Sequence, residues 1–198
     1  SIADEFLSGA CFVETDWYAC EFSYNNNSNI WIIDKNTGSM TLVGASGEHL
    51  SGLAYDDGGE ILYACNSSKL YTIDLDTGEA TLIGSMGNYG SMVGIACDSF
   101  GNLYGEDLGD DKLYSINKTT GIATPIGVFG IDLNYAQDMA IDKSTNICYI
   151  TGYKGSANGG GALYSVNTST GSASYIDDFP IGDLGCPSEI DAFAIEYV

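Results

Sequence analysis

A short sequence unit occurs four times in this chain and constrains its fold more than any other feature. Each copy has two apolar stretches around a tight polar turn. The copies are NIWIIDKNTGSMTLVG (29–44), KLYTIDLDTGEATLIG (69–84), KLYSINKTTGIATPIG (112–127) and ALYSVNTSTGSASYID (162–177). This pattern predicts two strands joined by a hairpin. The Asp or Asn that opens each turn can accept a backbone hydrogen bond, and the closing glycine can adopt the left-handed conformation that the return needs.

Two more strand-sized segments precede each copy, so each repeat holds four segments, called A to D in chain order. A and B lie in GACFVETDWYAC (9–20), GLAYDDGGEILYAC (52–65), GIACDSFGNLYGED (94–107) and DMAIDKSTNICYIT (138–151). The turn glycines Gly38, Gly78, Gly121 and Gly171 are 40, 43 and 50 residues apart. A period in this range with four strands per unit predicts an all-β fold, a β-propeller of four antiparallel blades.

We expect a single domain over 1–198, with repeats at about 9–44, 52–84, 94–127 and 138–177. The first repeat should have strands at 9–14, 17–22, 29–34 and 39–44. A fifth A-type segment, EIDAFAIEYV (189–198), follows the last repeat. It could continue a longer ring, lie beside the first blade, or pair with another chain. We favour self-association through 189–198, because the first blade already has its own A strand.

Aromatic residues recur at one position of B (Tyr18, Tyr63, Tyr104, Tyr149) and one of C (Trp31, Tyr71, Tyr114, Tyr164). Flat rings at fixed positions suit the packing of one sheet on the next, and we interpret them as blade core. The order gIaxD, GnLY, xLYxID, DxxTG resembles the blades of NHL-type, lactonase-like and quinoprotein-like propellers over nearly the whole chain. The resemblance implies the fold, but the docking tryptophan of quinoprotein dehydrogenases is missing after the turn. The arginines that would hold the quinone, and the arginine triad of sialidases, have no counterpart here.

The charge balance narrows the possible partners. The chain has 27 acidic and six basic residues, a formal net charge of −21, and all six basic residues are lysine. It therefore lacks the planar guanidinium fork that binds phosphate, and nucleic acid is excluded as an expected partner. An anionic membrane surface would repel the chain, and no apolar run approaches the roughly 20 residues of a membrane span.

Few residues mark an enzyme or a metal site. His49 is the only histidine, and no nucleophile elbow, phosphate-binding loop or C-x-x-C pair is present. We therefore expect no catalytic residues and no cofactor. The alternative is a propeller enzyme that acts on a glycan or lactone with carboxylates in an acidic funnel. A calcium site formed by Asp107, Asp110 and Asp111 is a second possibility. The alternative is that these carboxylates bind no metal and belong to an acidic surface that keeps the protein in solution.

Six cysteines could form disulfides if the protein is exported, and the acidic, arginine-free composition favours an extracellular or cell-surface location. If Thr15 and Asp16 form the turn between A and B, Cys11 lies opposite Cys20, where a cross-strand disulfide is feasible. Two buried free thiols are the alternative. The sequence assigns no partners to the remaining four cysteines, which are Cys65, Cys97, Cys148 and Cys186.

The B to C and D to A connections share one edge of an antiparallel blade and vary widely in length, whereas the other turns are short and regular. Variable loops on one face of a rigid scaffold are where recognition usually occurs. We therefore predict a ligand- or partner-binding face that carries His49, Tyr89, Phe129, Tyr135, Tyr153 and Phe179. The expected function is a non-catalytic, exported module that binds a protein or glycan or assembles with itself.

Overall fold

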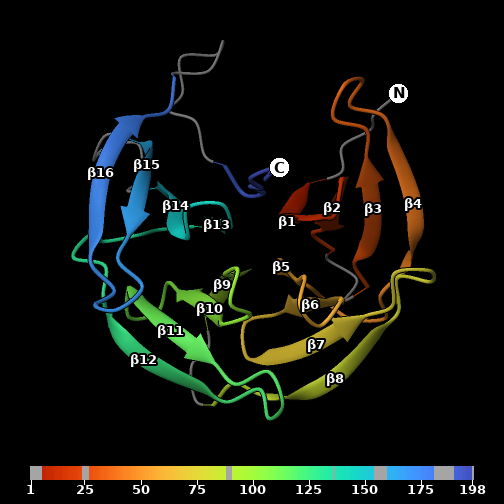
Figure 1. Cartoon of the computed structure of the whole chain (residues 1–198), viewed down its shortest axis with the longest axis horizontal. Coiled ribbons are helices and arrows are strands. Elements are labelled where there is room, and N and C mark those ends of the chain that lie inside the picture. Colours follow the sequence, from red (N-terminus) through yellow and green to blue (C-terminus); the bar gives the residue numbers. More distant parts are fainter. Residues whose placement is uncertain are drawn as a thin grey trace.

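In the computed structural model, sixteen strands form four four-stranded antiparallel sheets around a common centre (Figure 1). The structure describes residues 6–23, 27–87, 91–135, 137–153, 160–180 and 190–197. Each sheet is one blade of a β-propeller. No helix occurs among the described residues, and so none of them forms one that could cross a membrane.

The strands of each blade follow one another in sequence from the centre of the ring outward. Blade 1 contains β1 (Leu7–Val13), β2 (Asp16–Glu21), β3 (Asn29–Ile33) and β4 (Met40–Ala45). Blade 2 contains β5 (Gly52–Asp56), β6 (Ile61–Cys65), β7 (Lys69–Ile73) and β8 (Ala80–Ser85). Blade 3 contains β9 (Met92–Cys97), β10 (Leu103–Asp107), β11 (Lys112–Ile116) and β12 (Ala123–Val128). Blade 4 contains β13 (Met139–Asp142), β14 (Ile147–Tyr153), β15 (Gly161–Val166) and β16 (Ala173–Asp178).

The predicted all-β propeller and its four repeats are thereby confirmed. Apolar clusters fill each of the three seams between consecutive blades. Tyr71, Tyr114 and Tyr164, at the recurring aromatic position of C, are buried in the seams between blades 1 and 2, 2 and 3, and 3 and 4 respectively. These tyrosines are scaffold, as the sequence predicted.

The turns between the third and fourth strands join neighbouring blades as well as neighbouring strands. Asp34 Oδ1 accepts a hydrogen bond from the Asn36 N–H at 2.8 Å, and Asp74, Asn117 and Asn167 act alike. In blade 2 the turn glycine Gly78 lies directly against Gly44 of blade 1, with no room for a Cβ atom. Gly121 and Gly171 contact the preceding blade in the same way, so these three glycines serve the packing between blades in addition to the turn, whereas Gly38 serves the turn alone.

The first hairpin corrects the predicted register. Its turn residues are Glu14 and Thr15, and Glu14 adopts a left-handed conformation with φ of 54°. Val13 consequently pairs with Asp16, so that Cys11 lies opposite Tyr18 and Cys20 lies opposite Gly9. The predicted Cys11–Cys20 disulfide is absent from the structure, in which both thiols are free.

The described part of the C-terminal segment, residues 190–197, forms no strand. It lies near the centre of the ring between blade 4 and blade 1 (Figure 1). Ala192 and Ala194 pack on the apolar face of blade 1 that points away from blade 2, and Glu196 pairs with Lys35. The expected strand is therefore not formed over 190–197, whose described contacts lie within the chain, and pairing of this segment with another chain stays a prediction.

Candidate functional site

The face formed by the variable loops holds some of the predicted contact residues. His49 is half-buried, its Nδ1 lies 3.0 Å from the carbonyl oxygen of Ser23, and its ring meets the Phe22 ring edge-on. This packing holds the imidazole in place. Phe179 is also half-buried, and Tyr89 lies outside the described residues.

Two of the predicted contact residues belong to the core instead. Phe129 is 2% exposed and Tyr153 is 7% exposed. Phe129 packs in the apolar cluster between blades 3 and 4. This burial was not predictable from the sequence, because Phe129 folds back under its own loop and Tyr153 lies at the end of β14 and not in the connection that follows it.

Tyr135 is the predicted residue that stands out on this face. It is 67% exposed and has φ of 68°, an uncommon conformation for a residue with a side chain. Its ring packs edge-on against that of Tyr153 with 5.7 Å between the centroids. A buried aromatic residue thus supports an exposed one, so Tyr135 is held ready for contact rather than folded into the core.

The three proposed calcium ligands bind groups of the protein. Asp107 is buried and accepts a hydrogen bond from Gly109 N–H at 2.7 Å, while Asp110 binds Lys112 and the Tyr114 hydroxyl. Asp111 accepts from Leu133 N–H. Burial raises the pKa of Asp107 and that of Asp111 above the ordinary value. In the part of the chain that the structure describes, no three His, Cys, Asp or Glu side chains lie together as metal ligands.

The first strands of the four blades enclose a small apolar cavity at the centre of the ring. Its volume is about 30 Å³, room for one or two water molecules. Its lining includes side chains from every blade, such as Cys11, Leu53, Ile95 and Ile141. The space is too small for a sugar or a lactone.

Close backbone packing narrows the cavity at the end nearest the variable loops. Gly9, Gly52 and Gly94 lie at equivalent positions near the start of the first strands of blades 1 to 3 and contact the next blade so tightly that no side chain would fit. Blade 4 has Asp138 at this position. Its carboxylate is buried and accepts three backbone hydrogen bonds, from Ala10 (3.0 Å), Phe193 (2.8 Å) and Met139 (2.9 Å).

These bonds join blade 1, blade 4 and the C-terminal segment through one side chain. Burial raises the pKa of Asp138 well above its ordinary value, although the three N–H donors act to lower it. At the three seams between consecutive blades, glycines make the contact at this position. Between blade 4 and blade 1, the Asp138 carboxylate makes it instead.

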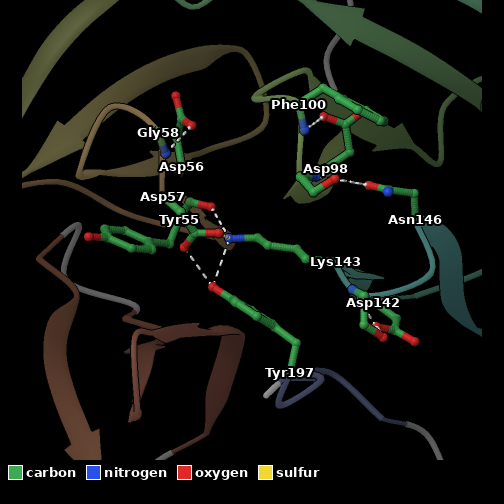
Figure 2. A network of polar contacts seen from close by, with 12 residues as sticks. Tyr55, Asp56, Asp57, Gly58, Asp98, Phe100, Asp142, Lys143, Asn146 and Tyr197 are labelled. Carbon is green, nitrogen blue, oxygen red and sulfur yellow. Dashed lines mark hydrogen bonds and ion pairs between the residues drawn. The ribbon is translucent and has the colours of Figure 1, made fainter.

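A polar network closes the opposite end, on the face of the short turns (Figure 2). Lys143 Nζ donates to the Tyr55 carbonyl oxygen (2.7 Å), Asp57 Oδ2 (2.8 Å) and the Tyr197 hydroxyl (2.9 Å). The Tyr197 hydroxyl donates to Asp57 Oδ1 at 2.7 Å. Burial, followed by the Asp57 carboxylate, raises the pKa of Tyr197. The phenol therefore stays protonated and locks the C-terminal segment to blade 2.

Neither end of this cavity was predicted from the sequence. The signal for Asp138 was present, because the aligned repeats read Gly, Gly, Gly and Asp at that position. No such signal existed for Lys143, whose partners Asp57 and Tyr197 lie in distant parts of the chain.

No protein-family profile matches the chain, and a comparison with curated sequences finds no match. Solved structures do match. A chain of a nidogen/laminin complex is 16% identical with a TM-score of 0.60, and the match covers 84% of this chain and 62% of that one. A gluconolactonase from Xanthomonas campestris is 12% identical with a TM-score of 0.63, covering 97% and 67%. An auxiliary nutrient binding protein from Bacteroides thetaiotaomicron is 12% identical with a TM-score of 0.56, covering 85% and 40%.

The chain therefore spans less than two thirds of the nidogen/laminin and nutrient binding chains that it resembles. At these identities the likeness concerns the fold. The class that it defines, together with the four blades, is the β-propeller, which carries binding proteins as well as enzymes.

Proposed function

We propose that the chain is a non-catalytic, exported or cell-surface propeller module that binds a protein or glycan through its variable-loop face. The observation that carries this proposal is Tyr135, which is exposed, has a left-handed backbone and rests on Tyr153. Backbone strain of this kind concentrates at functional sites. Exposed tyrosines contribute strongly to binding because they bury a large area with little loss of side-chain freedom.

The central cavity supports binding over catalysis. Its volume of about 30 Å³ leaves no room for a sugar or lactone. The buried carboxyl groups of Glu106 and Asp138 have no solvent exposure with which to meet a substrate. The gluconolactonase likeness supports the enzyme alternative at the level of the fold alone.

The net charge of −21 narrows the expected partner. A protein ligand should present a basic surface, and its association should slow as salt is added. A glycan ligand should be neutral, stacking on the tyrosine ring. The acidic, arginine-free composition supports an extracellular or cell-surface location.

Self-association through 189–198 is an alternative to binding through the loop face, and the structure supports it less well. Pairing of this segment with another chain would first have to break its contacts with Asp138 and with the pair Asp57–Lys143. Binding through the loop face requires no such rearrangement.

The test uses a printed glycan array and a displayed random-peptide library, both probed with the whole chain. Tyr135→Ala should weaken binding to the selected glycan or peptide by tenfold or more. Tyr175→Ala is the matched control, since Tyr175 is 55% exposed on the outer strand β16. Equal effects of the two substitutions, or hydrolysis of gluconolactone by the wild-type chain, would refute the proposal.

A further inference from the structure

Glu106 on β10 is a buried carboxyl group without a hydrogen-bond partner. The residue has no exposed surface, and neither Oε1 nor Oε2 has a partner in the structure. A buried carboxyl group is usually hydrogen-bonded or paired with a positive charge, and one without such a partner needs an explanation. The scaffold role alone does not supply one.

The other blades show how this position is normally filled. Glu106 pairs across its hairpin with Gly94, as Cys65 pairs with Gly52 and Cys20 with Gly9. In blades 1 and 2 the thiol lies 3.5 Å from a serine hydroxyl, that of Ser8 and that of Ser51.

In blade 4 the same position holds Thr151, whose hydroxyl donates to the carbonyl oxygen of Ile190 at 2.8 Å. Blade 3 differs from all of these, because Val93 stands where blades 1 and 2 have their serine. A valine side chain cannot form a hydrogen bond, so Glu106 in blade 3 lacks the serine hydroxyl that lies beside the corresponding residue in blades 1 and 2.

Glu106 belongs to the seam between blades 3 and 4. Its side chain lies on the same face of β10 as Tyr104, which packs in the cluster of that seam together with Cys148 of β14. The ionisable groups that act with it are Asp111, Asp138 and Cys148. None of the three provides a positive charge that could balance an ionised Glu106.

We propose that Glu106 is a proton-dependent lock between blades 3 and 4. While the carboxyl group is neutral, the seam stays packed. When it loses its proton, an unbalanced charge enters an apolar seam beside two other acids, and the seam loosens. The device is independent of ligand binding at the loop face.

The direction of the effect follows from the chemistry. Burial, and then the Asp111 charge, raises the pKa of Glu106 from its ordinary value of 4.5 to about 8. Between these values the folded chain holds a proton that the unfolded chain has released. The contribution to stability is therefore complete below pH 4.5 and is lost as the pH rises to about 8. Over this window the unfolding constant should rise by about tenfold per pH unit on account of this residue alone.

The first experiment compares urea unfolding of the wild-type chain and Glu106→Gln from pH 5 to pH 8. The variant should lack the pH-dependent loss, so its advantage over the wild type should grow with pH. Glu79→Gln, at an exposed glutamate, should leave the pH profile unchanged. If Glu106→Gln does not fold, Glu106→Cys combined with Val93→Ser rebuilds the pair found in blade 2. A difference between variant and wild type that is the same at all pH values would overturn the proposal.

The second experiment locates the opening within the molecule. Cys148 is a buried thiol in the seam beside Glu106, and Cys65 is an equally buried thiol in the cluster between blades 2 and 3. Alkylation at pH 8.5, quantified for each cysteine by mass spectrometry, should label Cys148 several-fold faster than Cys65 in the wild type. Glu106→Gln should remove that preference. The same labelling ratio in both proteins would show that the seam does not respond to Glu106.

Discussion

The conformation of one turn residue, Glu14, determines whether Cys11 and Cys20 are placed to form a disulfide. The left-handed conformation of Glu14 places Cys11 opposite Tyr18 and Cys20 opposite Gly9. The two cysteines lie on one face of the hairpin, but they are offset by two residues along the strands and do not face each other directly. A disulfide requires the two Cα atoms to lie within about 7 Å in a suitable orientation, which is most easily met by directly opposed residues. Burial raises the pKa of both thiols, so neither is a reactive thiolate at neutral pH.

We therefore predict that both cysteines are reduced in the purified protein. Alkylation in denaturant without a reducing agent should modify Cys11 and Cys20 fully, and mass spectrometry of the peptides would measure it. A parallel sample that is reduced first gives the mass of the fully modified chain. Recovery of a Cys11–Cys20 linked peptide from the unreduced sample would contradict the register of this hairpin.

Individual residues differ in how far the sequence determines them. The Asp and Asn residues that open the recurring turns were predictable because their hydrogen bonds reach only two residues along the chain. The burial of Phe129 was not, since it depends on how a loop folds back onto the seam between blades 3 and 4, and neither was that of Tyr153, which ends β14. Tyr135, in the same loop as Phe129, was correctly expected to be exposed.

At the scale of elements, all sixteen strands follow from the repeat, because each is a short apolar segment bounded by polar turns. The predicted boundaries in blade 1 are within two residues of those observed. Register is less predictable, since a shift of the turn by one residue changes every pair in the hairpin while leaving the strands in place.

The turn glycines Gly38 and Gly78 allow the cost of blade packing to be measured separately from that of the turn. Both have a left-handed backbone, with φ of 70° and 76°. A Cβ at Gly38 would meet nothing within 4 Å, whereas one at Gly78 would lie 2.9 Å from the carbonyl oxygen of Gly44 in blade 1. Any difference between alanine substitutions at the two sites therefore reports the contact between blades.

Gly38→Ala should lower the free energy of unfolding by about 1–2 kcal/mol through backbone strain. Gly78→Ala should cost about 1–3 kcal/mol more, because two backbones must move apart. Urea denaturation at equilibrium measures both. Equal losses for the two variants would mean that the blades can separate slightly at no cost, contrary to the packing in the structure.

At the scale of the whole molecule, the open side of the ring differs from its three regular seams. Blades 1 to 4 follow one another with apolar clusters between them, but the C-terminal segment lies between blade 4 and blade 1 (Figure 1). The sequence predicted a strand there from its apolar pattern. A pattern cannot reveal that the N–H group of Phe193 bonds to a carboxylate from blade 4, which competes with strand pairing.

Asp138 should consequently be the residue on which closure of the ring most depends. Its carboxylate accepts hydrogen bonds from Ala10 of blade 1, Met139 of blade 4 and Phe193 of the C-terminal segment. Asp138→Ala would leave these three donors, of which those of Ala10 and Met139 are buried, without this partner. Each unsatisfied group costs about 1–3 kcal/mol, and partial relaxation should reduce the sum to about 3 kcal/mol. Asp138→Asn keeps one acceptor oxygen and should lose roughly half as much.

Urea denaturation at pH 6 would measure these losses, with Asp76→Ala at an exposed turn position as the control that should change little. Closure through Asp138 also predicts where the damage appears. Amide hydrogen exchange should accelerate first in β1 and in residues 190–197, which the carboxylate holds, and not in β5 to β8 of blade 2. A loss of protection spread evenly over the four blades would mean that Asp138 supports the fold in general and that the ring closes by other contacts.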